Sequence, residues 1–285
     1  MRPIILSLAA ASAIAPLALG APIVFSAVSP TAAGIQATVD AFRTGLGTLN
    51  PPGACSPTPC LSGRREINWD GVPAGFSSPN DFPGGFFNGT AGIDPAGRQR
   101  GANFSTPGTA LRVSATEFSD ETSFGPTQFD VFSAPRLFGT LGSPITDVTF
   151  AVPGDPTKAA TVNGFGAVFT DVDLTGPTTI EFFTLAGASL GVFTVPGVNE
   201  PTGNTDTQGS LSFLGVIFNA GEHVGHVQIT AGTHGLDHTF AGDDDAVAMD
   251  DFIFGEPIAA VPEPSTFLTG GAALLALAGL RRRRS

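Results

Sequence analysis

Aspartates crowd the carboxyl-terminal part of the chain, and carboxylates at this density suit a cation site. Between residues 243 and 251 there are five, which are Asp243, Asp244, Asp245, Asp250 and Asp251. Calcium takes roughly six to eight oxygen ligands, and a bound ion relieves the repulsion between neighbouring carboxylates. Because adjacent residues of a strand point to opposite faces, Asp250 and Asp251 can share one ion only where a bulge intervenes. The segment is therefore a candidate calcium site, and a solvated acidic turn is the alternative.

Four histidines fall within a short stretch of the chain. They are His223, His226, His234 and His238. Imidazoles at such spacing can bind zinc or copper. His223 and His226 would face opposite sides of one strand, and the other two flank Asp237 in a glycine-rich turn. The pattern favours separate loop histidines, and a transition-metal site is the alternative.

The only two cysteines are Cys55 and Cys60, in the segment PPGACSPTPCLSG. In a chain that leaves the cytoplasm, a pair this close in sequence is typical of a disulfide. A metal site would need further ligands in the same loop, and a redox pair more often has two intervening residues than four. We therefore predict a local structural disulfide that stabilises the fold by about 2 kcal/mol at most.

Sequence signatures of catalysis are sparse. We expect no Gly-x-Ser-x-Gly nucleophile elbow, and the chain lacks the His-Glu-x-x-His pattern of zinc proteases and the phosphate-binding loop of nucleotide enzymes. A glycosidase needs two carboxylates across a cleft, and any acidic sandwich offers many such pairs. We predict no catalytic residues and no enzymatic activity, and a hydrolase of matrix polysaccharide is the alternative.

One helix is predicted near the amino-terminal end. Ser29 can cap it and Pro30 suits its first turn, while Gly45 or Gly47 can end it. Four apolar residues recur at helical spacing and form one stripe: Ile35, Val39, Phe42 and Leu46. We expect this helix to pack against the body rather than to bind a partner.

From residue 66 onward the pattern is that of short strands. We expect them at residues 67–70, 110–115, 129–132, 145–152, 160–171, 178–185, 189–195, 211–218, 224–230 and 246–254, with hairpin turns at 186–188 and 219–222. Phe86 and Phe87 are the expected anchors of the long loop that follows the first strand. Strands separated by frequent turn signals, without strand–helix–strand spacing, predict an antiparallel sandwich or barrel.

Composition limits the partners. The whole chain has a net charge of −12, and without Arg2, the four terminal arginines and Glu263 the remaining body stands near −16. This charge argues against binding nucleic acid or an anionic membrane surface. The chain contains 37 glycines and 24 prolines, which interrupt long helices. A body of this size can still bury one large core if it is all-β.

Both ends carry targeting features. Residues 1–20 form a predicted signal peptide, with Arg2 before an apolar segment and small residues up to Gly20, after which we place the cleavage. At the other end, a motif of Val261, Pro262, Glu263 and Pro264 precedes an uncharged run over residues 265–280. Four arginines then close the chain: Arg281, Arg282, Arg283 and Arg284. The run is short beside the about 20 residues of a free-standing membrane helix, and the arginines mark a cytoplasmic end.

This order of motif, apolar run and basic tip resembles the PEP-CTERM sorting signal of Gram-negative bacteria. The resemblance implies that residues 258–285 form a sorting signal with a transmembrane helix, which anchors the chain transiently in the inner membrane. It also implies that exosortase, a membrane cysteine transpeptidase, recognises Pro262-Glu263-Pro264 and removes the tail. A plain tail anchor is the alternative.

The body carries a second resemblance, on the segments GFGAVFTDVD, IEFFTLAGASLGVFTVP, SFLGVIFNAGEHVGHVQIT and DDDAVAMDDFIFGEP. They resemble the jelly-roll sandwich of many exported PEP-CTERM proteins and, more distantly, carbohydrate-binding modules. The resemblance implies an all-β fold, an antiparallel jelly-roll-like β-sandwich over residues 66–257, with the helix and disulfide loop in residues 21–65. In such modules acidic residues of the last strand hold calcium; the matching positions are Asp250 and Asp251, with Asp171 and Asp173 as earlier counterparts.

The two resemblances together imply a function. We expect an exported, non-enzymatic cell-surface or extracellular-matrix protein associated with exopolysaccharide and biofilm. Signal peptidase and exosortase are its expected partners during export, and extracellular polysaccharide is a further candidate. A calcium-dependent carbohydrate-binding module is the alternative, although its aromatic platform would have to be Phe, since Trp69 is the only tryptophan and there is no tyrosine.

Overall fold

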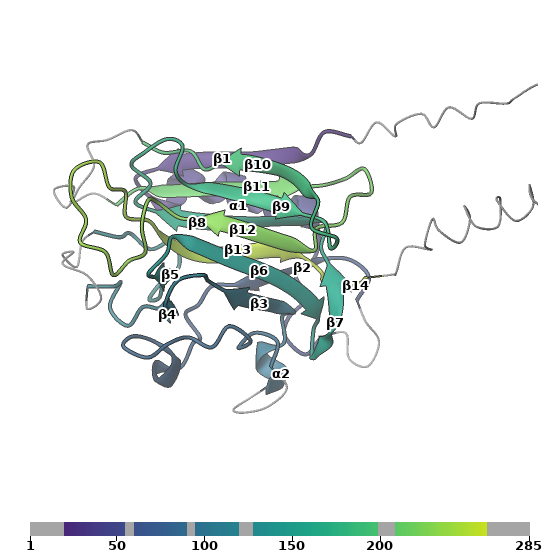
Figure 1. Ribbon diagram of the computed structural model, residues 1–285. Coiled ribbons are helices and arrows are strands. Elements are labelled where there is room, and N and C mark those ends of the chain that lie inside the picture. The colour runs from purple at the N-terminus through teal and green to yellow at the C-terminus, as the bar shows by residue number, and fades with distance from the viewer. Residues whose placement is uncertain (1–19, 55–59, 90–94, 120–127, 199–208, 261–285) are drawn as a thin grey trace, which may run out of the picture.

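The computed structural model describes residues 20–54, 60–89, 95–119, 128–198 and 209–260. These residues form a sandwich of two seven-stranded antiparallel sheets, as Figure 1 shows. The prediction of an all-β antiparallel sandwich is therefore confirmed. The predicted signal peptide up to residue 19, Cys55 and the predicted sorting signal from residue 261 lie outside the described residues.

The first sheet has the order β1-β11-β8-β13-β5-β4, with β2 beside β13. Its strands are β1 (Ile23–Ser29), β11 (Leu211–Ile217), β8 (Gly164–Thr170), β13 (Ala248–Gly255), β5 (Phe138–Leu141), β4 (Ala110–Val113) and β2 (Arg64–Ile67). The second sheet has the order β10-β9-β12-β6-β7-β14, with β3 beside β6. Its strands are β10 (Ser189–Thr194), β9 (Thr179–Phe183), β12 (His226–Thr230), β6 (Ile145–Val152), β7 (Asp155–Thr161), β14 (Ile258–Ala259) and β3 (Ala102–Ser105).

Four strand pairs are nested in the sequence. The hairpin β9–β10 is the innermost pair, then come β8 with β11, β6 with β12, and β5 with β13. Strands that follow one another from β10 to β13 therefore alternate between the sheets. This nesting explains why one predicted hairpin is confirmed and the other is wrong. The turn at residues 219–222 joins β11 to β12, which lie in opposite sheets.

The core lies between the sheets and is built from phenylalanines around one tryptophan. Trp69 stacks on Phe138 with ring centroids 4.2 Å apart and meets Phe252 edge-on at 5.1 Å. Its indole N–H donates to the carbonyl of Asp250 at 2.7 Å. Phe86 and Phe87 are buried against this core, as predicted.

A helix covers part of the outer face of the first sheet, so β8, β11 and β13 are buried on both faces. Helix α1 (Ala32–Leu46) turns its predicted stripe against β8, β11 and β13 (Figure 1). It begins later than predicted, because Ser29 ends β1 and the N-cap is Thr31, whose side chain makes no capping hydrogen bond. It ends at Gly47, which has a φ of +103°. Two short helices, η1 (Ala74–Phe76) and α2 (Pro95–Arg98), lie in the loop region.

Several predicted strand boundaries are wrong. The strand expected at 67–70 ends at Ile67, since Trp69 takes a φ of +63° and turns the chain out of the sheet. Residues 129–132 form no strand. The expected strand at 160–171 is two strands, β7 and β8, in different sheets. Strands β1, β3, β5 and β14 were not expected.

Among the described residues, no helix is both long and apolar enough to span a membrane.

Candidate functional sites

The five aspartates of the expected calcium site do not converge. Within the described ranges, a single group of three metal-binding side chains has its ligand atoms within 4.8 Å of one another, and it includes only one of the five, Asp244. Asp243 is exposed, Asp245 is buried beside β8, and the other two lie in β13. The structure therefore divides the acidic segment into separate sites.

Asp250 and Asp251 lie in a bulge of β13. In the pairing with β8, Met249 is opposite Phe169 and Phe252 is opposite Ala167, so β13 holds one extra residue here. Adjacent residues of a regular strand point to opposite faces, and the bulge lets both carboxylates reach one group. They do so at the hydroxyl of Ser133, whose Oγ lies 3.1 Å from Oδ1 of Asp250 and 2.9 Å from Oδ1 of Asp251.

Protein donors surround this carboxylate pair. Oδ2 of Asp250 accepts the backbone N–H groups of Phe132 and Ser133 at 2.7 and 3.0 Å. Oδ2 of Asp251 accepts from Nη2 of Arg43 at 3.1 Å, and the same guanidinium donates to Glu66. The pair therefore ties α1, β2 and the loop before β5 to the last long strand.

Burial changes the protonation of the pair. It raises the pKa of Asp250 to about 8; the charge of Asp251 adds to the rise, and the donors from Ser133 and Phe132 oppose it. Burial also raises the pKa of Asp251, while Ser133 and Arg43 lower it. The two carboxyl groups therefore share a proton at neutral pH.

A pocket of about 420 Å³ opens beside the pair, and its lining includes Arg43, Glu66, Arg100, Ser133 and Asp251. A carboxyl group with a raised pKa in a pocket is a common arrangement for acid–base chemistry. Here, however, both carboxyl groups contact one hydroxyl, that of Ser133, and their other oxygens are held by protein donors. Glycosidases keep their catalytic carboxylates about 5 Å or more apart with the scissile bond between them, whereas a serine side chain lies between this pair.

Asp245 fixes the backbone after β8. Its two carboxylate oxygens accept the N–H groups of Asp173 and Leu174, each at 3.3 Å. Burial raises the pKa of Asp245 to about 6, and these two N–H groups oppose the rise. Of the two earlier counterparts, Asp173 thus lies against Asp245, and Asp171 accepts a hydrogen bond from the amide of Gln128.

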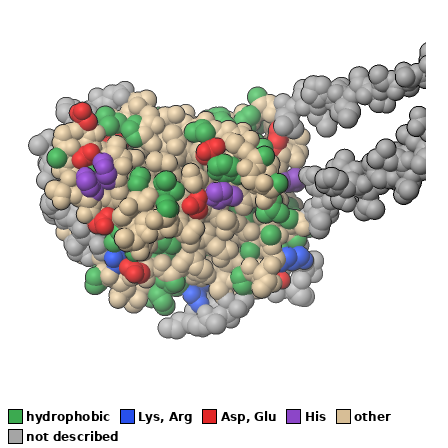
Figure 2. Space-filling model, in the orientation of Figure 1, with side chains coloured by type: hydrophobic (Ala, Val, Ile, Leu, Met, Phe, Trp, Pro, Cys, Tyr) green, Lys and Arg blue, Asp and Glu red, His purple; other side chains and the backbone are tan. Residues whose placement is uncertain are grey.

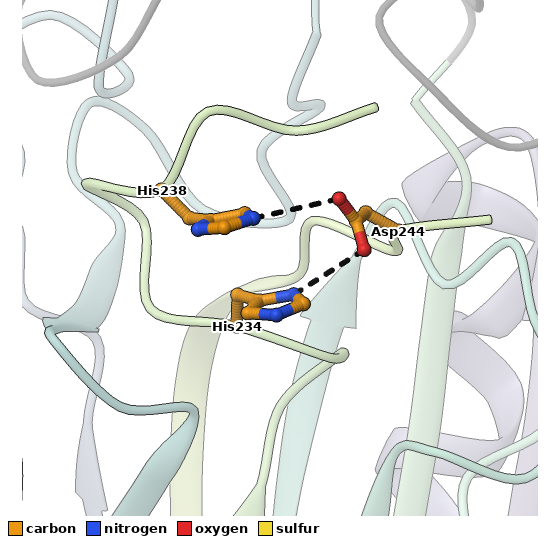
Figure 3. Close-up of side chains that lie close together, drawn as sticks. All are labelled: His234, His238 and Asp244. Carbon is orange, nitrogen blue, oxygen red and sulfur yellow. Dashed lines mark ion pairs between the residues drawn. The ribbon is translucent and has the colours of Figure 1, made fainter. Parts of the chain in front are cut away.

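His234, His238 and Asp244 come together, as Figure 3 shows. Nδ1 of His234 lies 3.5 Å from Oδ1 of Asp244, and Nε2 of His238 lies 3.5 Å from Oδ2. The expectation of separate loop histidines is thus wrong for these two. The backbone N–H of Ala241 and the two imidazoles hold the pKa of the Asp244 carboxyl below its ordinary value. The cue in the sequence is that Asp244 closely follows both histidines, so that one loop carries two imidazoles and a carboxylate.

The other two histidines are elsewhere. His223 is exposed in the turn before β12. His226 opens β12, lies 2.8 Å from Oδ1 of Asp147 through Nε2, and stacks on Phe183 with centroids 4.9 Å apart.

One serine stands in a pattern that is typical of catalytic nucleophiles. Residues 187–191 read Gly-Ala-Ser-Leu-Gly, which matches the Gly-x-Ser-x-Gly elbow of hydrolases. That elbow is a strand-to-helix turn, whereas this segment turns from β9 into β10. The hydroxyl of Ser189 donates to Glu181 on the neighbouring strand at 2.7 Å. The pattern is therefore part of a hairpin and does not form an elbow.

No free cysteine occurs among the described residues. Because Cys55 lies outside them, the Cys55–Cys60 pairing stays a prediction. No protein family, curated protein or solved structure matches this chain.

Proposed function

We propose that this chain is an exported, non-enzymatic protein of the bacterial cell surface or extracellular matrix, which exosortase processes at its carboxyl end. The observation that carries the proposal is the position of the tail motif. The last strand of the described residues, β14, ends at Ala259, and the N–H of Ala260 donates to the carbonyl of Ala159 at 3.0 Å. Pairing within the body thus extends to the residue before Val261-Pro262-Glu263-Pro264, so a cut at this motif would leave every described strand in place.

The amino-terminal end supports export in the same way. Strand β1 begins at Ile23 and pairs with β11 along its whole length. Signal peptidase cleavage after Gly20 would therefore leave every residue of this edge strand in place. Cleavage farther into the chain would remove pairing residues.

The finer fold that we propose for the body is a jelly roll. In that fold eight strands roll up as one long hairpin, so that the first pairs with the eighth and the fourth with the fifth. The nested pairs from β5–β13 to β9–β10 support this assignment. The acidic body, near −16 by formal charge, suits a soluble component of a polysaccharide matrix, because it does not bind anionic surfaces by charge.

The test is the carboxyl terminus of the exported protein. In a host with exosortase, intact mass spectrometry should find a mature chain that lacks Arg281 to Arg284. Replacing Pro262, Glu263 and Pro264 with alanine should retain the tail, as should deletion of exosortase. Replacing exposed Asp243 with alanine is the control and should leave processing unchanged. A tail that persists in the wild-type protein would refute the proposal.

A second candidate function, carbohydrate binding, is favoured by the open face of the second sheet. Phe183 and the ring of His226 stack there at an interplanar angle of 17°. Asp147 of β6 accepts hydrogen bonds from two side chains of the neighbouring strand β12, His226 and Gln228. A flat ring surface beside carboxylate and amide groups suits a sugar, whose C–H face stacks and whose hydroxyl groups hydrogen-bond.

A glycan array with and without calcium tests this candidate. Binding should fall with Phe183→Ala and persist with Val192→Ala, an exposed apolar residue on the same sheet. Glycan binding that needs calcium would support a calcium-dependent carbohydrate-binding module. Glycan binding without calcium would show that calcium is not a cofactor of this activity. If no glycan binds, this second candidate is wrong, but the export proposal is unaffected.

A further inference from the structure

The loop between β12 and β13 crosses from one sheet to the other and carries His234, His238 and Asp244. It lies at the left end of the molecule in Figure 1, and Figure 2 shows histidine and acidic side chains together at that end of the surface. The three side chains belong neither to the buried aspartate pair nor to the proposed sorting signal. They need a separate explanation.

The loop is held firmly at both ends of the cluster. Beside His234, the N–H of Thr233 donates to the carbonyl of Asp245 at 3.0 Å, and the N–H of Asp245 donates to Oγ1 of Thr233 at 2.9 Å. Before His238, the N–H of Leu236 donates to the carbonyl of Thr140 in β5 at 2.8 Å, and the Leu236 side chain is buried. The backbone positions of all three residues are thus fixed by contacts outside the cluster.

Glycine allows this close approach of the two loop segments. Gly232 has a φ of +66°, and a Cβ atom there would lie 2.2 Å from the carbonyl oxygen of Asp245. The segments that carry His234 and Asp244 can therefore run side by side only with glycine at this position.

The two imidazoles present their nitrogens to one carboxylate. Their rings lie parallel, with centroids 3.9 Å apart and an interplanar angle of 8°, and both face Asp244 (Figure 3). The edges of both rings are set against Phe240, at 6.3 Å for His234 and 5.4 Å for His238. Asp244 is oriented by the N–H of Ala241, which donates to Oδ2 at 3.0 Å. Each side chain thus has a partner that limits its rotation.

From this geometry we infer that His234, His238 and Asp244 bind one divalent transition-metal ion of the zinc type. One ligand atom from each residue lies within 4.8 Å of the other two. Ligands of a tetrahedral ion with bonds of about 2.0–2.2 Å lie roughly 3.5 Å apart, so a shift of about 1 Å by these side chains brings all three onto one ion. Two imidazole nitrogens and one carboxylate oxygen suit zinc, copper, nickel or cobalt, whereas calcium prefers a shell of oxygens. Three protein ligands leave a further coordination position for water.

Metal binding requires a small movement of the rings. An imidazole binds a metal in its own plane, so two parallel rings must splay for both nitrogens to reach one ion. Both side chains are about two-fifths exposed, at 42% and 41%, so solvent-facing space for this rotation exists. In the metal-bound form Nδ1 of His234 exchanges its contact with Oγ1 of Thr233, now 3.0 Å, for the ion.

Titration of the purified exported protein with Zn²⁺ and Co²⁺ tests the inference. Calorimetry should find one Zn²⁺ per chain, and Co²⁺ should give visible absorption bands of low coordination number. His234→Ala, His238→Ala and Asp244→Asn should each weaken binding by about 100-fold or more, because loss of even an outer partner of a metal ligand weakens it about 10–100-fold. His223→Ala, at an exposed histidine outside the cluster, is the matched control and should bind as the wild type does.

Melting curves provide the second measurement. Zn²⁺ should raise the melting temperature of the wild type and of His223→Ala but not that of the ligand variants. Should His234→Ala fail to fold, His238→Ala carries the test, since His238 is exposed on its turn. Unchanged stoichiometric binding in the double variant His234→Ala with His238→Ala would overturn the inference. So would saturation by Ca²⁺ in place of Zn²⁺, or equal weakening by the His223 control.

Discussion

Among single residues, Asp250 shows most clearly how burial changes chemistry. Its carboxyl is almost fully buried, lies beside a second carboxyl, and has a pKa raised to about 8. In the unfolded chain an aspartate titrates near pH 4, at about 3.9. Between these two values the folded state binds more protons than the unfolded state. The contribution of Asp250 to the free energy of unfolding therefore falls as pH rises from about 4 through about 8.

We predict that Asp250→Asn removes most of this pH dependence. The amide imitates the protonated carboxyl, so the variant should match the wild type near pH 4, where the carboxyl is largely protonated in both states, and exceed it increasingly up to pH 9. The difference at pH 9 should be on the order of a few kcal/mol. Denaturant unfolding between pH 4 and pH 9 measures it. Asp243→Asn, at an exposed aspartate, should leave the wild-type slope unchanged, and an unchanged slope in Asp250→Asn would contradict the shared-proton interpretation.

Asp245 contributes to the same trend over a narrower range. Its pKa is raised to about 6, so its contribution to the free energy of unfolding also falls as pH rises, from about 4 through about 6. Asp244, by contrast, has a lowered pKa. The two neighbouring aspartates thus differ in pKa because Asp245 is buried, whereas Asp244 faces solvent and accepts the N–H of Ala241.

At the scale of elements, the close packing of α1 on the first sheet depends on two glycines of that sheet. Gly166 of β8 and Gly215 of β11 are directly paired. A Cβ atom on Gly215 would lie 2.7 Å from the ring of Phe42, and one on Gly166 would lie 3.0 Å from it. The absence of side chains at these two positions lets the aromatic ring of α1 reach the sheet.

Gly215→Ala should therefore destabilise the protein by about 1–3 kcal/mol through overpacking. Phe42→Ala alone should cost about 3–5 kcal/mol, because it empties a buried site. In the double variant the cost of the alanine should fall clearly, since the nearer of the two rings that its Cβ meets is gone and only Phe213 remains, at 3.0 Å. Denaturant unfolding of the four proteins measures this coupling. Gly75→Ala, where an added Cβ has no neighbour within 4 Å, is the control; strictly additive costs would show that Phe42 does not fill this groove.

For the whole molecule, the carboxyl end of the body is fixed by a buried ion pair. Arg65 of β2 donates to both carboxylate oxygens of Glu256, at 2.6 and 2.8 Å, and both side chains are buried. Glu256 directly follows β13, and β14 then pairs with β7. The sandwich is therefore complete only when the chain continues to about residue 260.

We predict that a chain ending at Ala260 unfolds at the same temperature as one that also carries the tail. A chain ending at Gly255 should be less stable by about 3–5 kcal/mol, because the buried guanidinium loses its carboxylate. Glu256→Gln in the longer chain separates this loss from the loss of β14, and it should account for most of the difference. Equal stability of the chains ending at Gly255 and Ala260 would place the end of the body earlier than we do.

Local spacing in the sequence was sufficient to predict several parts of this protein. The stripe from Ile35 to Leu46 predicts a helix with one buried face, because helical spacing places those residues together whatever they pack against. Alternation at residues 145–152 predicts β6 with its observed bounds. The turn at 186–188 predicts the innermost hairpin, since the two strands that it joins are neighbours in the sequence.

Strand partners and protonation states depended on the tertiary structure. Nothing local distinguishes the turn at 219–222 from a hairpin turn; its strands separate because β11 pairs with β8 and β12 with β6, which are distant in sequence. Likewise, Asp244 and Asp245 are adjacent in the chain, but folding places Asp244 beside two histidines and buries Asp245 against the backbone that follows β8. Spacing determines which face a residue takes, whereas long-range packing determines the water, charges and donors around it, and these decide its chemistry.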